Sequence, residues 1–183
     1  MQQEDSKNHK HVGVDVRPAN DGGTEAGNGT GHGADAAKIH RRRYEDFALV
    51  LNDSCEVMYL SGLQWNMVAT DNALWDTGAV TTTITKELAD KIGVEPEGIV
   101  KVGSMGGNSD GYCAHVNLKL GDVVIPFLRV NVLDLTKREE EARREGLPYH
   151  HPDVWIGMDV ISQGRFEVNS SGSETILTFE IPN

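Results

Sequence analysis

The sequence predicts an all-β domain, and the pattern of its apolar residues carries that prediction. From residue 39 onward, short apolar runs dominate, and some alternate with polar residues, as in HVNLKL at 115–120. Turn-forming pairs such as Gly121-Asp122 separate these runs. Helical periodicity is confined to short segments, so strands must form most of the core.

Each expected strand is a short β-type run bounded by turn residues or charged residues. The runs span residues 47–51, 56–60, 65–69, 73–75, 99–102, 114–120, 123–132, 154–156, 165–169 and 175–181.

Two helices and one shorter helical turn are expected between these strands. Residues 85–92 place apolar side chains one turn apart, with Thr85 as the N-cap and Gly93 as the stop. Residues 136–145 are almost wholly polar and predict a charged surface helix; Thr136 and Glu139 have the spacing of a capping box. A short helical turn is expected at 158–162, after a glycine.

The chain divides by composition into a flexible Gly-rich extension, residues 1–38, and one folded domain, residues 39–183. The extension holds 7 of the 20 glycines and lacks Leu, Ile, Phe, Tyr and Trp. Such a segment cannot bury enough apolar surface to offset its ordering entropy. The basic cluster at 41–43 is expected to form a solvated edge of the linker, because acids follow it directly.

Composition excludes several classes of function. A net charge of −11 argues against binding to nucleic acid or an anionic membrane, and no apolar run is long enough for a membrane helix. Two cysteines outside any CxxC pair and a polar N-terminus predict free thiols and a cytoplasmic protein. We expect no cofactor and no metal, because His150, His151 and Asp153 lack a chelating arrangement.

The segment that carries chemistry is ALWDTGA, residues 73–79. An apolar strand leads into Asp76-Thr77-Gly78, where the glycine permits a tight turn and the threonine can stiffen it. Alone, this tripeptide is weak evidence, since chance produces it in roughly one of forty chains of this length. A second apolar strand that breaks at a glycine, VWIGMD at 154–159, and a Gly-rich hairpin between the two motifs make it informative.

Together these segments resemble the retroviral-type, retropepsin-like aspartic proteases, and most closely their small bacterial members. The resemblance covers residues 65–183 and includes ALWDTGA, the Gly-rich hairpin, VWIGMDVISQGRFEV and the closing TILTFEIPN. It implies a single-lobe acid-protease barrel that hydrolyses peptide bonds. Two departures stand out: Val80 replaces the acid that many members carry after the alanine, and Met158-Asp159 stand where they carry an arginine. Because both halves of that ion pair are missing, we expect an alternative packing there.

The resemblance also implies a role for each matched residue. Asp76 is the catalytic acid, and Thr77, Gly78 and Ala79 complete its loop. Ile156 and Gly157 give structural support behind that loop. The hairpin tip, Met105, Gly106, Gly107 and Asn108, corresponds to the flap that covers the substrate.

The chain contains one Asp-Thr-Gly, whereas the chemistry needs two carboxyl groups, one acting as base and one as acid. We therefore expect a homodimer in which Asp76 faces Asp76 of its twin, with a peptide or protein as substrate. The alternative is a catalytically silent dimerisation or peptide-binding module. A third possibility is a monomer that dimerises only when a partner concentrates it.

Overall fold

The computed structural model describes residues 37–104 and 107–182. Nearly all of the predicted extension, residues 1–38, therefore lies outside the described residues, and its boundary stays a prediction. The remaining elements form the all-β domain that the sequence predicts, with few and short helices.

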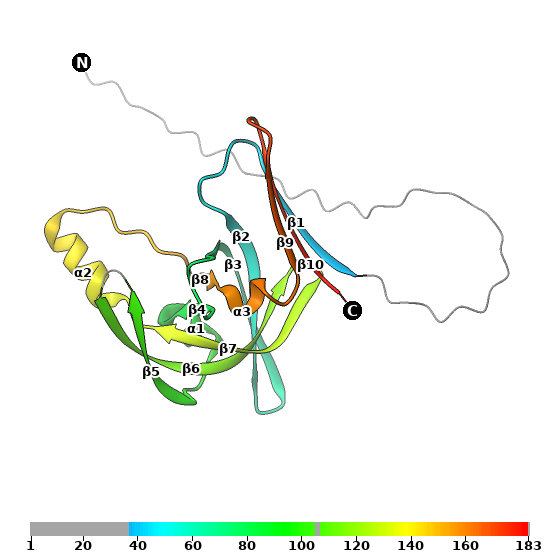
Figure 1. Cartoon of the computed structure of the whole chain (residues 1–183). Helices are drawn as coiled ribbons and strands as arrows, with labels where there is room; N and C mark the ends of the chain where they lie inside the picture. Colours follow the sequence, from blue (N-terminus) through cyan, green and yellow to red (C-terminus); the bar gives the residue numbers. More distant parts are fainter. Residues whose placement is uncertain (1–36, 105–106, 183) are drawn as a thin grey trace, which may run out of the picture. The chain divides into compact units, whose positions relative to one another are not determined.

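Ten strands and three helices occur within the described residues (Figure 1). The strands are β1 (Lys38–Tyr44), β2 (Asn52–Ser61), β3 (Gln64–Trp75), β4 (Thr83–Thr85), β5 (Gly98–Ser104), β6 (Gly107–Leu120), β7 (Val123–Leu133), β8 (Val154–Ile156), β9 (Arg165–Ser170) and β10 (Thr175–Ile181). The helices are α1 (Lys86–Ile92), α2 (Thr136–Glu145) and α3 (Met158–Ile161).

The strands form two sheets, one of which closes on itself. The larger sheet has the order β2-β3-β8-β4-β7-β6-β5. An additional pairing of β2 with β6 closes six of these strands into a barrel and leaves β5 outside the ring. The smaller sheet is antiparallel with the order β1-β10-β9. Closure satisfies the backbone groups that an open edge would leave unpaired. The predicted single-lobe barrel is therefore confirmed.

The helices are short and lie outside the strand pairing. The Thr85 hydroxyl accepts a hydrogen bond from the Leu88 amide of α1, 3.3 Å away, which confirms the predicted cap. No residue of α2 is buried, so the charged surface helix is also confirmed. None of the described helices is both long and apolar enough to cross a bilayer.

Three local predictions are wrong. Residues 47–51 form no strand: they connect the two sheets, and Leu49 is 86% exposed. The basic cluster at 41–43 is part of β1, paired with β10. The predicted capping box of α2 is absent, because Asp134, two residues before Thr136, accepts from the Thr136 amide at 3.0 Å.

A buried tryptophan of the larger sheet packs against aromatic side chains of the smaller sheet. Trp75, the last residue of β3, is 4% exposed. Its ring lies 5.0 Å from that of Phe166 on β9 and 5.2 Å from that of Phe179 on β10, measured between centroids. Aromatic burial of this kind fixes the direction of the strand end. The residue after that strand end is Asp76.

Candidate active site

Asp76 sits where β3 ends beside β8. The two strands run parallel, with Trp75 paired to Ile156, and the Asp76 amide donates to the Ile156 carbonyl at 2.9 Å. Both strand ends are buried at this point. The backbone of Asp76 is therefore held by a second strand that lies 80 residues later in the sequence.

The loop after Asp76 folds back on the aspartate. The Ala79 amide donates to the Asp76 carbonyl at 3.1 Å, and the Gly78 amide donates to Oδ1 of Asp76 at 2.9 Å. A side chain at Gly78 would place its Cβ 3.2 Å from that same carboxylate oxygen. A glycine here lets a backbone donor orient the carboxylate without crowding it.

Gly157 lies directly behind this loop. A Cβ at this position would be 2.8 Å from the Thr81 carbonyl carbon and 3.0 Å from the Ala79 carbonyl oxygen. The Met158 amide donates to that Ala79 oxygen at 2.8 Å. The structure thus places Gly157 in backbone contact with the loop, in the position that the prediction of structural support requires, next to the fully buried Ile156.

Asp159 provides the alternative packing expected where the arginine is missing. Its carboxylate accepts from the Thr82 amide at 2.8 Å and from the Thr82 hydroxyl at 2.6 Å. That hydroxyl in turn accepts from the Gly157 amide at 3.0 Å. Thr82 is fully buried, so these bonds tie α3 to the segment after the Asp76 loop. Sequence reasoning named Asp159 as a departure but did not find Thr82.

A cleft of about 640 Å³ opens above Asp76. The described residues that line it come from the Asp76 loop, β4, the β5–β6 hairpin, β7, α2 and β8: Asp76, Gly78, Ala79, Val80, Thr81, Thr83, Lys101, Val102, Gly103, Ser109, Asn131, Leu133, Leu135, Arg138, Tyr149 and Trp155. Asp76 is the one acid among these lining residues. A largely apolar groove with an acid at one end is suited to hold a peptide beside that acid.

Comparison with known families agrees with this geometry. The family model described as "Aspartyl protease" matches residues 64–160, which is more than half of the chain and includes both Asp76 and Gly157. The chain belongs to the aspartyl protease family. This finding confirms the resemblance predicted from the sequence.

A solved structure and a search of curated proteins complete the comparison. The chain is similar to a retropepsin-like aspartic protease from Rickettsia conorii, with a TM-score of 0.44 and 13% identity over 80% of this chain and 96% of that chain. None of the curated proteins matches the chain.

The hairpin predicted as the protease flap is formed by β5 and β6. Their ladder continues to the Ser104–Gly107 pair, with Asn108 opposite Gly103. Met105 and Gly106, at the predicted tip, lie outside the described residues. The neighbouring part of the hairpin, which includes Gly103 and Ser109, lines the cleft.

Thr77, Gly78 and Val80 face outward beside Asp76. Thr77 and Gly78 are exposed, and Val80 is 79% exposed. Valine at this position replaces the acid of many members of the family with an apolar side chain. The loop that carries Asp76 therefore presents uncovered surface.

Asp53, His40 and Trp75 form a buried polar cluster that was not predicted from the sequence. Asp53 on β2 is 1% exposed and accepts from the Trp75 indole at 3.0 Å, and its carboxylate lies 2.6 Å from Nε2 of His40 on β1. Burial alone would raise the pKa of Asp53, but the hydrogen bonds to His40 and Trp75 and the His40 charge together hold it below its usual value. The cluster connects β1, β2 and β3, the strand that ends just before Asp76.

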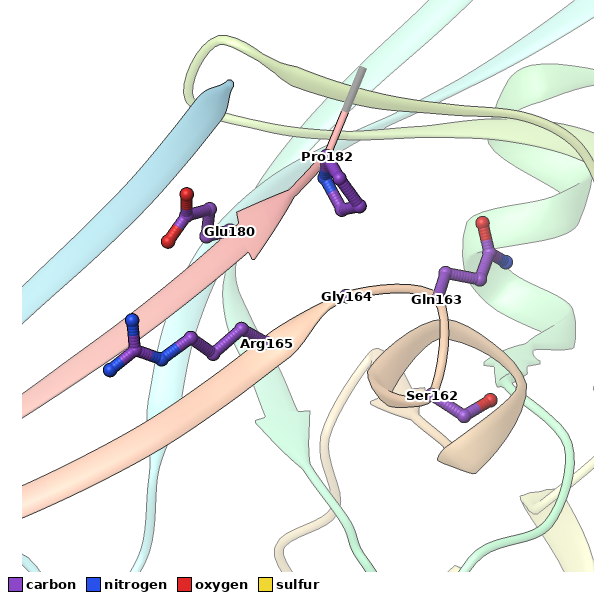
Figure 2. A pocket seen from close by; sticks show the side chains of 6 residues that line it. All are labelled: Ser162, Gln163, Gly164, Arg165, Glu180 and Pro182. Carbon is purple, nitrogen blue, oxygen red and sulfur yellow. The ribbon is translucent and has the colours of Figure 1, made fainter.

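Other polar groups lie outside this site. Figure 2 shows a second cavity, lined by Ser162, Gln163, Gly164, Arg165, Glu180 and Pro182. Its volume is about 420 Å³, and no predicted site residue lines it.

Across residues 37–104 and 107–182, no group of three His, Cys, Asp or Glu side chains is placed to hold a metal ion. Both cysteines are buried, and burial raises the pKa of Cys55 to about 12.

Proposed function

We propose that the chain is an aspartic endopeptidase in which the Asp76 residues of two identical chains activate a water molecule. The observation that carries the proposal is the position of Asp76. It follows a buried strand, accepts a backbone hydrogen bond from Gly78, and lines a cleft of about 640 Å³ within the segment matched by the aspartyl protease family.

The proposed chemistry needs two carboxyl groups, and the described cleft of one chain contains one. In the reaction, one carboxylate removes a proton from water while the other, protonated, donates to the scissile carbonyl. Two carboxyl groups about 3 Å apart cannot both be ionised, so the pair supplies both forms. A second copy of this chain would bring the missing carboxyl across a two-fold axis.

The exposed surface beside Asp76 supports such a pairing. Thr77, Gly78 and Val80 are uncovered in the single chain. A two-fold contact through this loop would bury the Val80 side chain and place the Thr77 hydroxyls close to each other. In this assembly Thr77 would connect the two loops, as the family resemblance implies.

The substrate is proposed to be a peptide in extended form. The cleft has a hairpin on one side, and β5 lies outside the closed ring of strands. An extended peptide can add main-chain hydrogen bonds to such a hairpin while its side chains enter the cleft. Closure of the hairpin over the substrate would exclude water from the reacting bond.

Cleavage of a peptide library between pH 4 and 7, by the full chain and by Asp76→Asn, tests this proposal. We expect the substitution to abolish cleavage while leaving the circular dichroism spectrum unchanged. Equal turnover by both proteins would refute the role of Asp76. A well-folded dimer that binds peptides without cleaving them would instead support the silent peptide-binding module.

A further inference from the structure

One end of the cleft is built by α2 and the chain that follows it. Leu135, Arg138 and Tyr149 line this end, next to Trp155 of β8. Arg138 is partly buried, whereas Arg143 and Arg144 of the same helix are exposed and line no part of the cleft. Residues of both α2 and β5 line this cleft. The helix therefore contributes one arginine to the cleft and leaves the others in solvent.

A second cation lines the same cleft from β5. Lys101 lies three residues before the end of that strand, and its cross-strand neighbour Asp110 is not among the lining residues. Two cations thus face one acid, Asp76, in a chain whose net charge is −11.

We propose that Arg138 and Lys101 form a subsite that selects peptides with an acidic side chain. This inference rests on the proposed function and adds a substrate class to it. A guanidinium can donate two parallel hydrogen bonds to a carboxylate, and the lysine ammonium adds a second positive charge. Leu135, Tyr149 and Trp155 line the same cleft and add apolar surface, and a less polar surrounding strengthens charge pairing.

The two residues act on substrate choice and not on the chemical step. Neither belongs to the Asp76 loop, whose carboxylate accepts from the Gly78 amide of the same loop. Removal of Arg138 should therefore change the ratio of cleavage rates between acidic and neutral peptides. A purely structural role would change both rates together and leave their ratio unaltered.

The experiment uses sets of three peptides that are identical except at one position, which carries Glu, Gln or Lys. A separate set is made for each position of the peptide. All peptides carry amidated C-termini, and one Gln peptide with a free C-terminus shows whether a terminal carboxylate is recognised instead. The proteins are the full chain, Arg138→Gln, Arg138→Glu and Lys101→Gln, with Arg144→Gln as the matched control on the same helix. Peptide binding to the Asp76→Asn variant is measured in parallel.

We expect the Glu peptide at one position to be cleaved about tenfold better than the Gln peptide, as a charge-assisted pair implies. Arg138→Gln and Lys101→Gln should lower that ratio toward one, Arg138→Glu should favour the Lys peptide, and Arg144→Gln should change nothing. A wild-type protein without acidic preference at any position, or a preference that survives both neutral substitutions, overturns the subsite while the protease proposal stands. Recognition of the free C-terminus alone also overturns it. If no peptide is cleaved, the protease proposal fails. The subsite is then tested by binding to the Asp76→Asn variant: tighter binding of the Glu peptide than of the Gln peptide supports it, and equal binding overturns it.

Discussion

Asp159 shows how a single side chain can replace an ion pair that this chain lacks. Its carboxylate binds the amide and the hydroxyl of Thr82, and that hydroxyl receives the Gly157 amide. The bonds run from α3 to the segment just after the Asp76 loop. Asp159 therefore positions the loop from behind, and it does so without contact with Asp76.

Asp159→Ala should destabilise the domain by roughly 2–4 kcal/mol, because two charge-assisted hydrogen bonds are lost and the buried Thr82 amide keeps no partner. Chemical denaturation followed by tryptophan fluorescence measures this. The control is Asp122→Ala, at the exposed β6–β7 turn, which should change stability by less than about 0.5 kcal/mol. Equal losses in both variants would show that Asp159 is an ordinary surface acid.

Asp53 should make the stability of the domain depend on acid pH. Its pKa is held below the usual aspartate value in the folded state by His40 and Trp75, which outweigh its burial. A lowered folded pKa stabilises the fold fully above the unfolded value, about pH 4, and that contribution is lost as pH falls further through the folded pKa.

We therefore expect wild type to exceed Asp53→Asn in unfolding free energy by a constant amount above about pH 5, with the gap narrowing below about pH 4. Urea unfolding at a series of pH values provides the measurement. A gap that stays constant down to pH 2, or that widens on acidification, would contradict the assignment.

Among the elements, α1 begins at the N-cap that the sequence predicts. Thr85 is both the last residue of β4 and the N-cap of α1, and its hydroxyl accepts from the Leu88 amide. Thr85→Ala should cost about 1 kcal/mol of stability, whereas Thr85→Ser keeps the accepting oxygen and should cost less. Thermal unfolding of the two variants compares them, and an equal loss would mean that the hydroxyl does not cap the helix.

Elements with a local pattern were predictable, and elements made by distant pairing were not. Residues 115–120 of β6 and 177–181 of β10 alternate between apolar and polar in the sequence, so the faces of these strands can be assigned without a structure. In contrast, β1 is basic and pairs only with β10, and the three-residue β4 forms between β7 and β8. Residues 47–51 look like a strand by composition, but they form none: Leu51 accepts one backbone bond from the Trp75 amide at 3.1 Å, and Leu49 is exposed.

The same distinction applies to the site. Asp76 and Gly157 follow from two motifs in the sequence, since each motif ends an apolar run at a glycine. The His40–Asp53 contact joins the two sheets, and no short-range sequence pattern predicts a contact of this kind. One indication existed: Asp53 shares the buried face of β2 with Cys55 and Val57, where an acid requires a partner.

At the scale of the whole molecule, we expect the specific activity to depend on protein concentration. If the competent site forms only between two chains, specific activity should fall when the protein is diluted below its dimer dissociation constant. Sedimentation across the same dilution series should show monomer appearing as activity is lost. Constant specific activity in a range where the chain sediments as a monomer would contradict the shared site.

The most direct test of the central claim mixes wild type with Asp76→Asn and refolds the two together, so that mixed dimers form. If each site needs both Asp76 carboxyls, an equal mixture should show about half the activity per wild-type chain, because half of those chains pair with an inactive partner. A larger excess of the variant should suppress activity further. Activity that stays proportional to wild-type chain at every ratio would show that one aspartate is enough and would contradict the account.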